Sequence, residues 1–142
     1  MRRVLSKIPR PLETKEVSLA IDKHRNLDII LLATKNGEVR AFENFCPHAG
    51  GPLNLFPDVF LAPDKKNIMC TRHGATFALE DGLCNSGPCI GLKLNQLEVN
   101  SDNGVVTAED GELRRLCEQG GLQGLVQQRR ALLERRRQSR GE

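Results

Sequence analysis

Two short cysteine–histidine pairs constrain the fold of this chain more than any other feature of the sequence. The first pair is Cys46-Pro47-His48 and the second is Cys70-Thr71-Arg72-His73. Each pair is followed by glycine-containing sequence, which favours tight loops. Two thiolates and two imidazoles fit a [2Fe-2S] centre in which two histidines replace two cysteines on one iron. Two such loops would clasp the cluster from both sides, with both sulfurs on one iron and both nitrogens on the other.

Two other kinds of site also use cysteine and histidine. Structural zinc sites usually place a Cys-x(2–4)-Cys pair before a His-x(3–5)-His pair, which is a different order of ligands from this one. A cysteine beside a histidine can also form a reactive thiolate for nucleophilic catalysis. A nucleophile would leave the second pair unexplained, so a zinc-bound interaction module is the main alternative to the cluster.

The segments around the two pairs, residues 46–53 and 70–77, resemble the two cluster-binding boxes of Rieske ferredoxins. Residues 82–88 are similar to the glycine-proline loop of the same family, and the resemblance extends over residues 15–108. It implies a Rieske-type [2Fe-2S] cluster as cofactor. The implied ligands of the cluster, and thus the metal-binding residues, are Cys46, His48, Cys70 and His73.

The order of short strands and turns indicates an all-β fold, an antiparallel β-sandwich or barrel. The resemblance implies in addition a cluster-binding subdomain inserted into this framework. We therefore expect a basic N-terminal tail at residues 1–12, a Rieske domain at residues 13–108, and a helical, Arg-rich C-terminal extension at residues 109–142.

Particular strands and turns can be predicted from alternation and composition. Residues 15–21 and 27–34 read as strands. Asn36-Gly37 predicts a two-residue hairpin turn that leads into the first box. Residues 68–70 and 75–79 form a second hairpin-like pair. Residues 92–99 are expected to form a strand, which Asp102-Asn103-Gly104 turns into another at residues 105–107.

The sequence becomes helical from Glu109 onward. The acids Glu109, Asp110 and Glu112 suit a helix N-terminus, and Gly120-Gly121 interrupts the pattern before a second helix with many arginines. This extension is expected either to pack on the barrel or to bind a partner.

Length and charge restrict the class of protein further. A chain of 142 residues is too short for an oxygenase that carries both a Rieske domain and a separate mononuclear iron domain. It has no apolar run of about 18 residues that would span a membrane. No secretory signal is visible, so a cytoplasmic location is expected. The chain is basic at both ends and acidic between them, which suits a carrier that docks electrostatically. The tail has no aromatic residue, so a nucleic-acid partner is not expected.

The other three cysteines and two residues of the second cluster-binding box bear on the redox chemistry. Cys84, Cys89 and Cys117 are expected to be reduced thiols that the cluster does not need. High-potential members of the family carry a disulfide between the boxes, a Ser two residues after the second ligand His and a Tyr two residues further on. This sequence lacks the bracing cysteines and has Ala75 and Phe77 at those positions. The resemblance therefore implies a low potential.

Together these features predict an electron carrier that is not itself an enzyme. It would pass single electrons between a reductase and a terminal oxygenase or other acceptor. The alternative within the same family is a small accessory subunit of a larger reductase or oxygenase complex.

Overall fold

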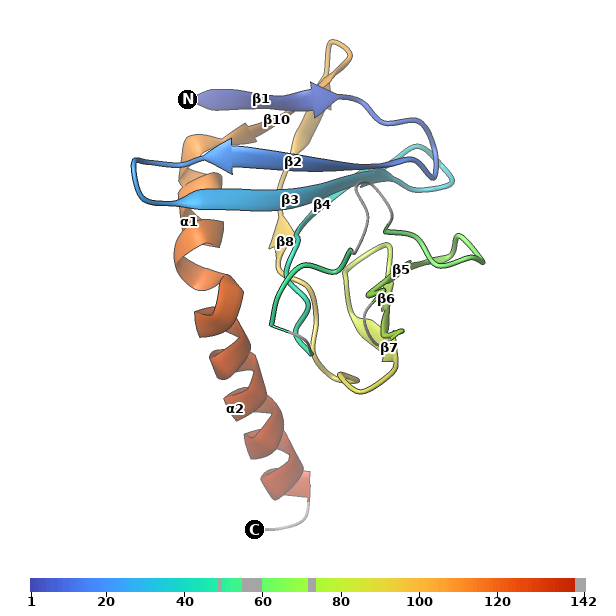
Figure 1. Cartoon of the computed structure of the whole chain (residues 1–142), viewed down its shortest axis with the longest axis vertical. Coiled ribbons are helices and arrows are strands. Elements are labelled where there is room, and N and C mark those ends of the chain that lie inside the picture. Colours follow the sequence, from blue (N-terminus) through green and yellow to red (C-terminus); the bar gives the residue numbers. More distant parts are fainter. Residues whose placement is uncertain (49, 55–59, 72–73, 140–142) are drawn as a thin grey trace.

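The computed structural model describes residues 1–48, 50–54, 60–71 and 74–139. Ten strands followed by two helices lie within these residues (Figure 1). The strands are β1 (Arg2–Lys7), β2 (Thr14–Ala20), β3 (Asn26–Ala33), β4 (Val39–Glu43), β5 (Asn67–Met69), β6 (Thr76–Ala78), β7 (Cys84–Ser86), β8 (Gln96–Leu97), β9 (Asn100–Asp102) and β10 (Val105–Glu109). The helices are α1 (Asp110–Gln119) and α2 (Gly121–Ser139).

The strands form three antiparallel sheets, in the orders β1-β10-β9, β2-β3-β4-β8 and β5-β6-β7. β4 pairs with β8 through Ala41–Leu97 and Phe42–Gln96, although the third sheet separates these two strands along the chain. The small sheet β5-β6-β7 is therefore inserted into a framework formed by the other two (Figure 1). This confirms the predicted fold class, an antiparallel β framework with an inserted subdomain and a helical C-terminal extension.

Strand β3 is the element shared by the two halves of the core. Its residues Ile29, Ile30, Leu31 and Leu32 are all at most 1% exposed. Successive side chains of a strand point to opposite faces of its sheet. Ile29 and Leu31 accordingly pack in a cluster with β10 and α1, whereas Ile30 and Leu32 pack with the residues of the inserted subdomain. The apolar run thus anchors both the framework and the subdomain that holds the cysteines.

The hairpin predicted at Asn36-Gly37 is confirmed, since β3 pairs with β4 on either side of it. The prediction that the turn contains two residues is wrong. Gly37 has a φ of 84°, but Asn36 is not in the left-handed region. The N–H of Gly37 donates to the carbonyl of Thr34 (2.9 Å), and the N–H of Thr34 donates to Glu38 (2.8 Å). This is a three-residue loop, in which only the last residue needs a positive φ.

The expectation of an N-terminal tail at residues 1–12 does not hold for its first half. Arg2–Lys7 is β1, which pairs with β10 at the edge of its sheet. The register shifts between Val4 and Ser6, and Leu5 is buried. Such a bulge breaks the two-residue alternation by which a strand is recognised in sequence. The basic side chains lie on an edge strand, where charge is common.

The strand predicted at residues 92–99 is much shorter than expected, because β8 contains only Gln96 and Leu97. Leu92 and Leu94 are buried, as their spacing suggested. The backbone of Lys93 is bonded instead by a side chain of α2. Gln128 accepts from its N–H (2.9 Å) and donates to its carbonyl (3.0 Å). A helix side chain thus occupies the backbone groups through which a neighbouring strand would pair.

The two predicted C-terminal helices are present, and they meet at Gly120. Leu113 and Leu116 of α1 are buried against the framework. In α2 the buried positions are Gly124 and Leu125, whereas Leu122 and other apolar residues of the helix are exposed. No helix in the described part of the chain combines the length and the apolar character needed to cross a bilayer.

Candidate metal centre

The first ligand loop, residues 46–51, follows β4 and is closed by backbone hydrogen bonds at both ends. The N–H of Cys46 donates to the carbonyl of Gly51 (2.7 Å), and the N–H of Gly50 donates to the carbonyl of Cys46 (2.8 Å). Gly50 has a φ of 70°, a conformation that L side chains rarely adopt. The glycine therefore lets the chain turn back immediately after the Cys–His pair.

The second ligand loop, residues 70–75, follows β5 and repeats this frame. The N–H of Cys70 donates to the carbonyl of Ala75 (2.8 Å), and the N–H of Gly74 donates to the carbonyl of Cys70 (2.9 Å). Gly74 has a φ of 74°. In both loops the cysteine is thus bonded to the residues four and five positions later. Two segments of different sequence have the same backbone closure, as a pair of matching ligand loops requires.

A buried asparagine joins the two loops, and sequence reasoning missed it. The side-chain oxygen of Asn44 accepts from the N–H of Leu53 (2.9 Å), just after the first loop. The carbonyl of Leu53 accepts from both the N–H and the hydroxyl of Thr71 in the second loop (2.9 Å each). Asn44 is only 6% exposed. No local pattern marks this residue, because the partner of its side-chain oxygen lies nine residues further along the chain.

The structure describes three of the four predicted site residues. Cys46 and Cys70 are fully buried in the apolar cluster of the subdomain, and His48 is partly exposed. His73 lies outside the described residues. Among those that are described, no three Cys, His, Asp or Glu side chains converge as they would around a single metal ion.

Cys84 and Cys89 lie in the same apolar cluster as Cys46 and Cys70. The thiol of Cys89 donates to the sulfur of Cys84, with the two sulfurs 3.1 Å apart. Burial, the hydrogen bond to Cys84 and the nearby sulfurs of Cys46 and Cys70 all raise the pKa of Cys89 well above its usual range. All five cysteines are among the described residues, and none forms a disulfide.

The donor set fits an iron–sulfur cluster. The two buried thiols can be held as thiolates only by a metal or another strong compensating charge, since burial in apolar surroundings disfavours a bare anion. Soft thiolate ligands suit iron–sulfur clusters. The Nδ1 atom of His48 is also buried, although the residue as a whole is partly exposed. A buried sulfur pair beside a partly exposed histidine is the arrangement that a mixed Cys–His cluster needs.

Helix α2 covers the side of the subdomain on which His48 lies. The guanidinium of Arg129 donates to the carbonyl of Pro47, between the cysteine and the histidine of the first loop (3.2 Å). At its start, α2 is held by the buried end of β4, where the carboxylate of Glu43 accepts from the N–H of Gly121 (2.8 Å). Sequence reasoning identified the helix but not its contact with the first ligand loop.

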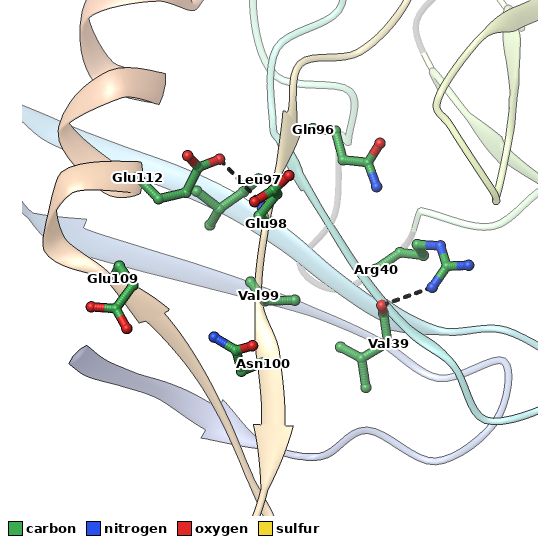
Figure 2. A pocket seen from close by; sticks show the side chains of 9 residues that line it. All are labelled: Val39, Arg40, Gln96, Leu97, Glu98, Val99, Asn100, Glu109 and Glu112. Atoms are coloured by element: carbon green, nitrogen blue, oxygen red, sulfur yellow. Dashed lines mark hydrogen bonds between the residues drawn. The ribbon is translucent and has the colours of Figure 1, made fainter.

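One cavity lies on the framework and another lies beside the first ligand loop. One of about 320 Å³ lies on the framework, between β4, the segment 96–100 and the start of α1 (Figure 2). It is lined by Glu98, Glu109 and Glu112 among others, and by no residue of either ligand loop. The other, of about 230 Å³, is lined by His48 and Cys89 together with side chains of α2. Only the second adjoins the candidate centre.

Several solved structures share this fold. A Sphingomonas yanoikuyae B1 ferredoxin is 19% identical, with a TM-score of 0.57 over 77% of this chain and 98% of that one. A chain of the complex of reduced oxygenase and oxidized ferredoxin in carbazole 1,9a-dioxygenase is 20% identical, with a TM-score of 0.58 over 77% and 93%. The terminal oxygenase of carbazole 1,9a-dioxygenase from Nocardioides aromaticivorans IC177 is 24% identical, with a TM-score of 0.58 over 75% of this chain but 29% of that one.

No curated protein matches the chain. The family model of the Rieske [2Fe-2S] domain matches residues 10–113, which is more than half of the chain and includes both ligand loops and the segment between them. Members of this family carry a [2Fe-2S] cluster, in agreement with the cofactor predicted from the two Cys–His pairs. The chain belongs to the Rieske [2Fe-2S] domain family.

Proposed function

We propose that this protein is a one-electron carrier and not an enzyme by itself. It would take electrons from a reductase and pass them to an oxygenase or another acceptor. Cys46, His48, Cys70 and His73 would hold the [2Fe-2S] cluster, which supplies reversible one-electron chemistry when it is bound. The observation that carries the proposal is the repeated frame of the two ligand loops, with both cysteine sulfurs buried and His48 at the surface.

The residues of the chain have separate tasks in this proposal. Cys46 and Cys70 keep their sulfurs away from water, because solvent exposure is one of the levers on the potential of such a centre. His48 places one edge of the centre near the surface, where a partner can approach. Asn44 and Thr71 keep the two loops together through Leu53. The carrier then needs little reorganisation when its charge changes.

The similarity to known proteins supports a carrier more than an oxygenase. The matched region takes up 98% of the S. yanoikuyae ferredoxin but 29% of the N. aromaticivorans oxygenase chain. The carbazole 1,9a-dioxygenase structure contains a ferredoxin together with an oxygenase, so a redox partner protein of this kind is a reasonable acceptor. We place the carrier in the cytoplasm, where thiols such as Cys84 and Cys89 stay reduced.

A permanent accessory subunit is the second candidate, and α2 favours it. The helix has exposed apolar residues, with Leu122 66% and Leu133 55% exposed. A subunit would elute with its partner when native extract is separated by size, and a free carrier would elute alone. Gel filtration followed by detection of the chain distinguishes the two.

Analysis of the purified protein tests the proposal directly. We expect about two iron and two sulfide per chain, and a reversible one-electron change in the visible spectrum. His48→Cys should shift the spectrum towards that of an all-cysteine cluster or lose the cluster. A colourless protein containing zinc would contradict the proposal and favour the interaction module, because zinc is d¹⁰.

A further inference from the structure

Helix α2 is docked on the inserted subdomain at three points. Gln128 bonds both backbone groups of Lys93. Leu132 lies close to Gly91: a Cβ atom added to Gly91 would be 3.0 Å from the Cδ1 atom of Leu132. Arg129 donates to Pro47 in the first ligand loop. The helix is therefore fixed beside His48 and is not a detached tail.

The docked helix completes a surface that is apolar at its centre and cationic around it. The cavity of about 230 Å³ beside His48 is lined by apolar side chains of both the subdomain and α2. Ile90 and Leu133, which are 59% and 55% exposed, extend it outward. Arg129 and Arg136 line it as well. These two arginines are seven residues apart, so they lie on the same face of the helix. We call the surface formed by His48, Ile90, Leu133, Arg129 and Arg136 the His48 surface.

The charge of the His48 surface is not neutralised by neighbouring acids. No acidic residue lines the cavity among the described residues. The ion pairs of the described chain engage Arg2, Lys15, Arg25, Arg40, Arg115 and the N-terminus, and none of the α2 arginines. The same part of α2 also carries Arg130, Arg135 and Arg137 against Glu134. The positive field is thus concentrated on one helix, next to one proposed ligand.

We infer that the His48 surface is a docking site for a redox partner that presents carboxylates around an apolar patch. This inference rests on the proposed electron transfer and adds the chemistry of the partner to it. A cationic rim raises the rate of encounter with an acidic protein and orients it. Exposed apolar residues at the centre then exclude water from the contact. Docking there brings the partner to the edge of the centre at which His48 reaches the surface.

The first test uses a peptide and does not require the cluster. Fluorescein-labelled hexaglutamate is titrated with the full chain at about 0.1 M ionic strength, where the Debye length is about 10 Å, and binding is followed by anisotropy. Arg136→Glu should weaken binding at least about threefold. Arg114→Glu makes the same change in net charge on an exposed position of α1, and it should change binding by less than about 1.5-fold. About 0.5 M salt should abolish the difference.

The second test joins the surface to electron transfer. The reduced protein is oxidised by ferricyanide, an anion, or by hexaamminecobalt(III), a cation, in a stopped-flow instrument that records the visible absorbance. Arg136→Glu should slow oxidation by the anion about threefold to tenfold and should accelerate oxidation by the cation. Arg114→Glu should change neither rate. Equal effects of the two variants, or no effect of Arg136→Glu on peptide binding, would overturn the inference. A protein without colour would refute the carrier instead, and the peptide result would still decide on the surface.

Discussion

The two ligand loops have the same backbone closure but different surroundings. In each, a cysteine bonds the residues four and five positions later, and the fourth is a glycine with a φ near 70°. In the first loop the histidine is two residues after the cysteine, and in the second it is three residues after. The closure therefore fixes the sulfur in the same way in both loops. The position of the histidine within the frame is free to differ.

The surroundings differ at the residue after each cysteine. Pro47 has no N–H, and its carbonyl accepts from Arg129 of α2. Thr71 uses both its N–H and its hydroxyl to bond Leu53, next to the first loop. The second loop is thus held by the first, and the first is held by β4 and the C-terminal helix. The contact with the C-terminal helix therefore distinguishes the surroundings of the first loop.

Removal of either sulfur should have the largest effect and should be the same for both loops. Cys46→Ser and Cys70→Ser are each expected to lower the iron content from about two per chain to nearly zero, because each removes one of four ligands. Cys117→Ser is the control, since this residue lies on α1 away from both loops and should leave the iron content unchanged. Iron is measured by colorimetric assay after gel filtration. Retention of iron in only one of the two variants would contradict the prediction that the two loops contribute equally to cluster binding.

Removal of the asparagine that joins the loops should have the next largest effect. Asn44→Ala leaves the buried N–H of Leu53 without its acceptor, which costs about 1–3 kcal/mol of unfolding free energy. Asn54→Ala is a matched control, because Asn54 is less buried and receives one hydrogen bond from Asn44. It should cost less than about 1 kcal/mol. Urea unfolding followed by circular dichroism measures both, and equal losses would show that the N–H of Leu53 is not the group that matters.

Local patterns in the sequence predicted the residues of the frame but not the contacts that hold it. The Cys–His pairs and their glycines are local, so both loops could be recognised before the fold was known. The contacts of Asn44 with Leu53, and of Gln128 with Lys93, join segments far apart in the chain or outside any repeating pattern. The length of β8, two residues, could likewise not be foreseen from the alternation of apolar residues.

The two Asn-Gly dipeptides show the same limit at a turn. Asn103 and Gly104 both have positive φ, 51° and 81°, and they join β9 to β10 as a two-residue turn. Asn36-Gly37 has the same letters but a three-residue loop, because the hydrogen bonds of its flanking strands place the closing pair one residue further out. The dipeptide predicts that the chain reverses. The register of the paired strands decides how.

The glycines of the two frames should be equally sensitive to substitution. Gly50→Ala and Gly74→Ala each force an L side chain into the left-handed region, at φ of 70° and 74°. A Cβ at either position meets nothing within 4 Å, so the cost is conformational and about 1–2 kcal/mol. Gly51→Ala tests the same loop without a positive φ and with equally open space, and should be nearly neutral. The urea unfolding midpoints of the three variants are compared. A large loss of stability in Gly51→Ala would show that crowding, and not the backbone conformation, causes the losses.

The smallest effect concerns the potential, at the position where the loops end. Gly51 and Ala75 are equivalent, since each accepts from the N–H of its cysteine. By resemblance, high-potential relatives place a serine hydroxyl at the position of Ala75, which is fully buried here, and a tyrosine at Phe77. Without these donors the midpoint should lie in the lower part of the range of roughly −150 to +300 mV.

Ala75→Ser should raise this midpoint, because a hydroxyl that donates to sulfur stabilises the more electron-rich reduced state. One hydrogen bond contributes about 0.5–1.5 kcal/mol, and 59 mV corresponds to about 1.4 kcal/mol for one electron, so the shift should be about 20–60 mV. Gly51→Ser is the matched change in the first loop. Its hydroxyl is expected to bond water at this partly exposed position and to move the midpoint by less than about 10 mV. A redox titration of the three proteins decides. A wild-type midpoint above about +150 mV, or equal shifts in both variants, would mean that another donor already serves the sulfurs and that the two loop ends do not differ in this respect.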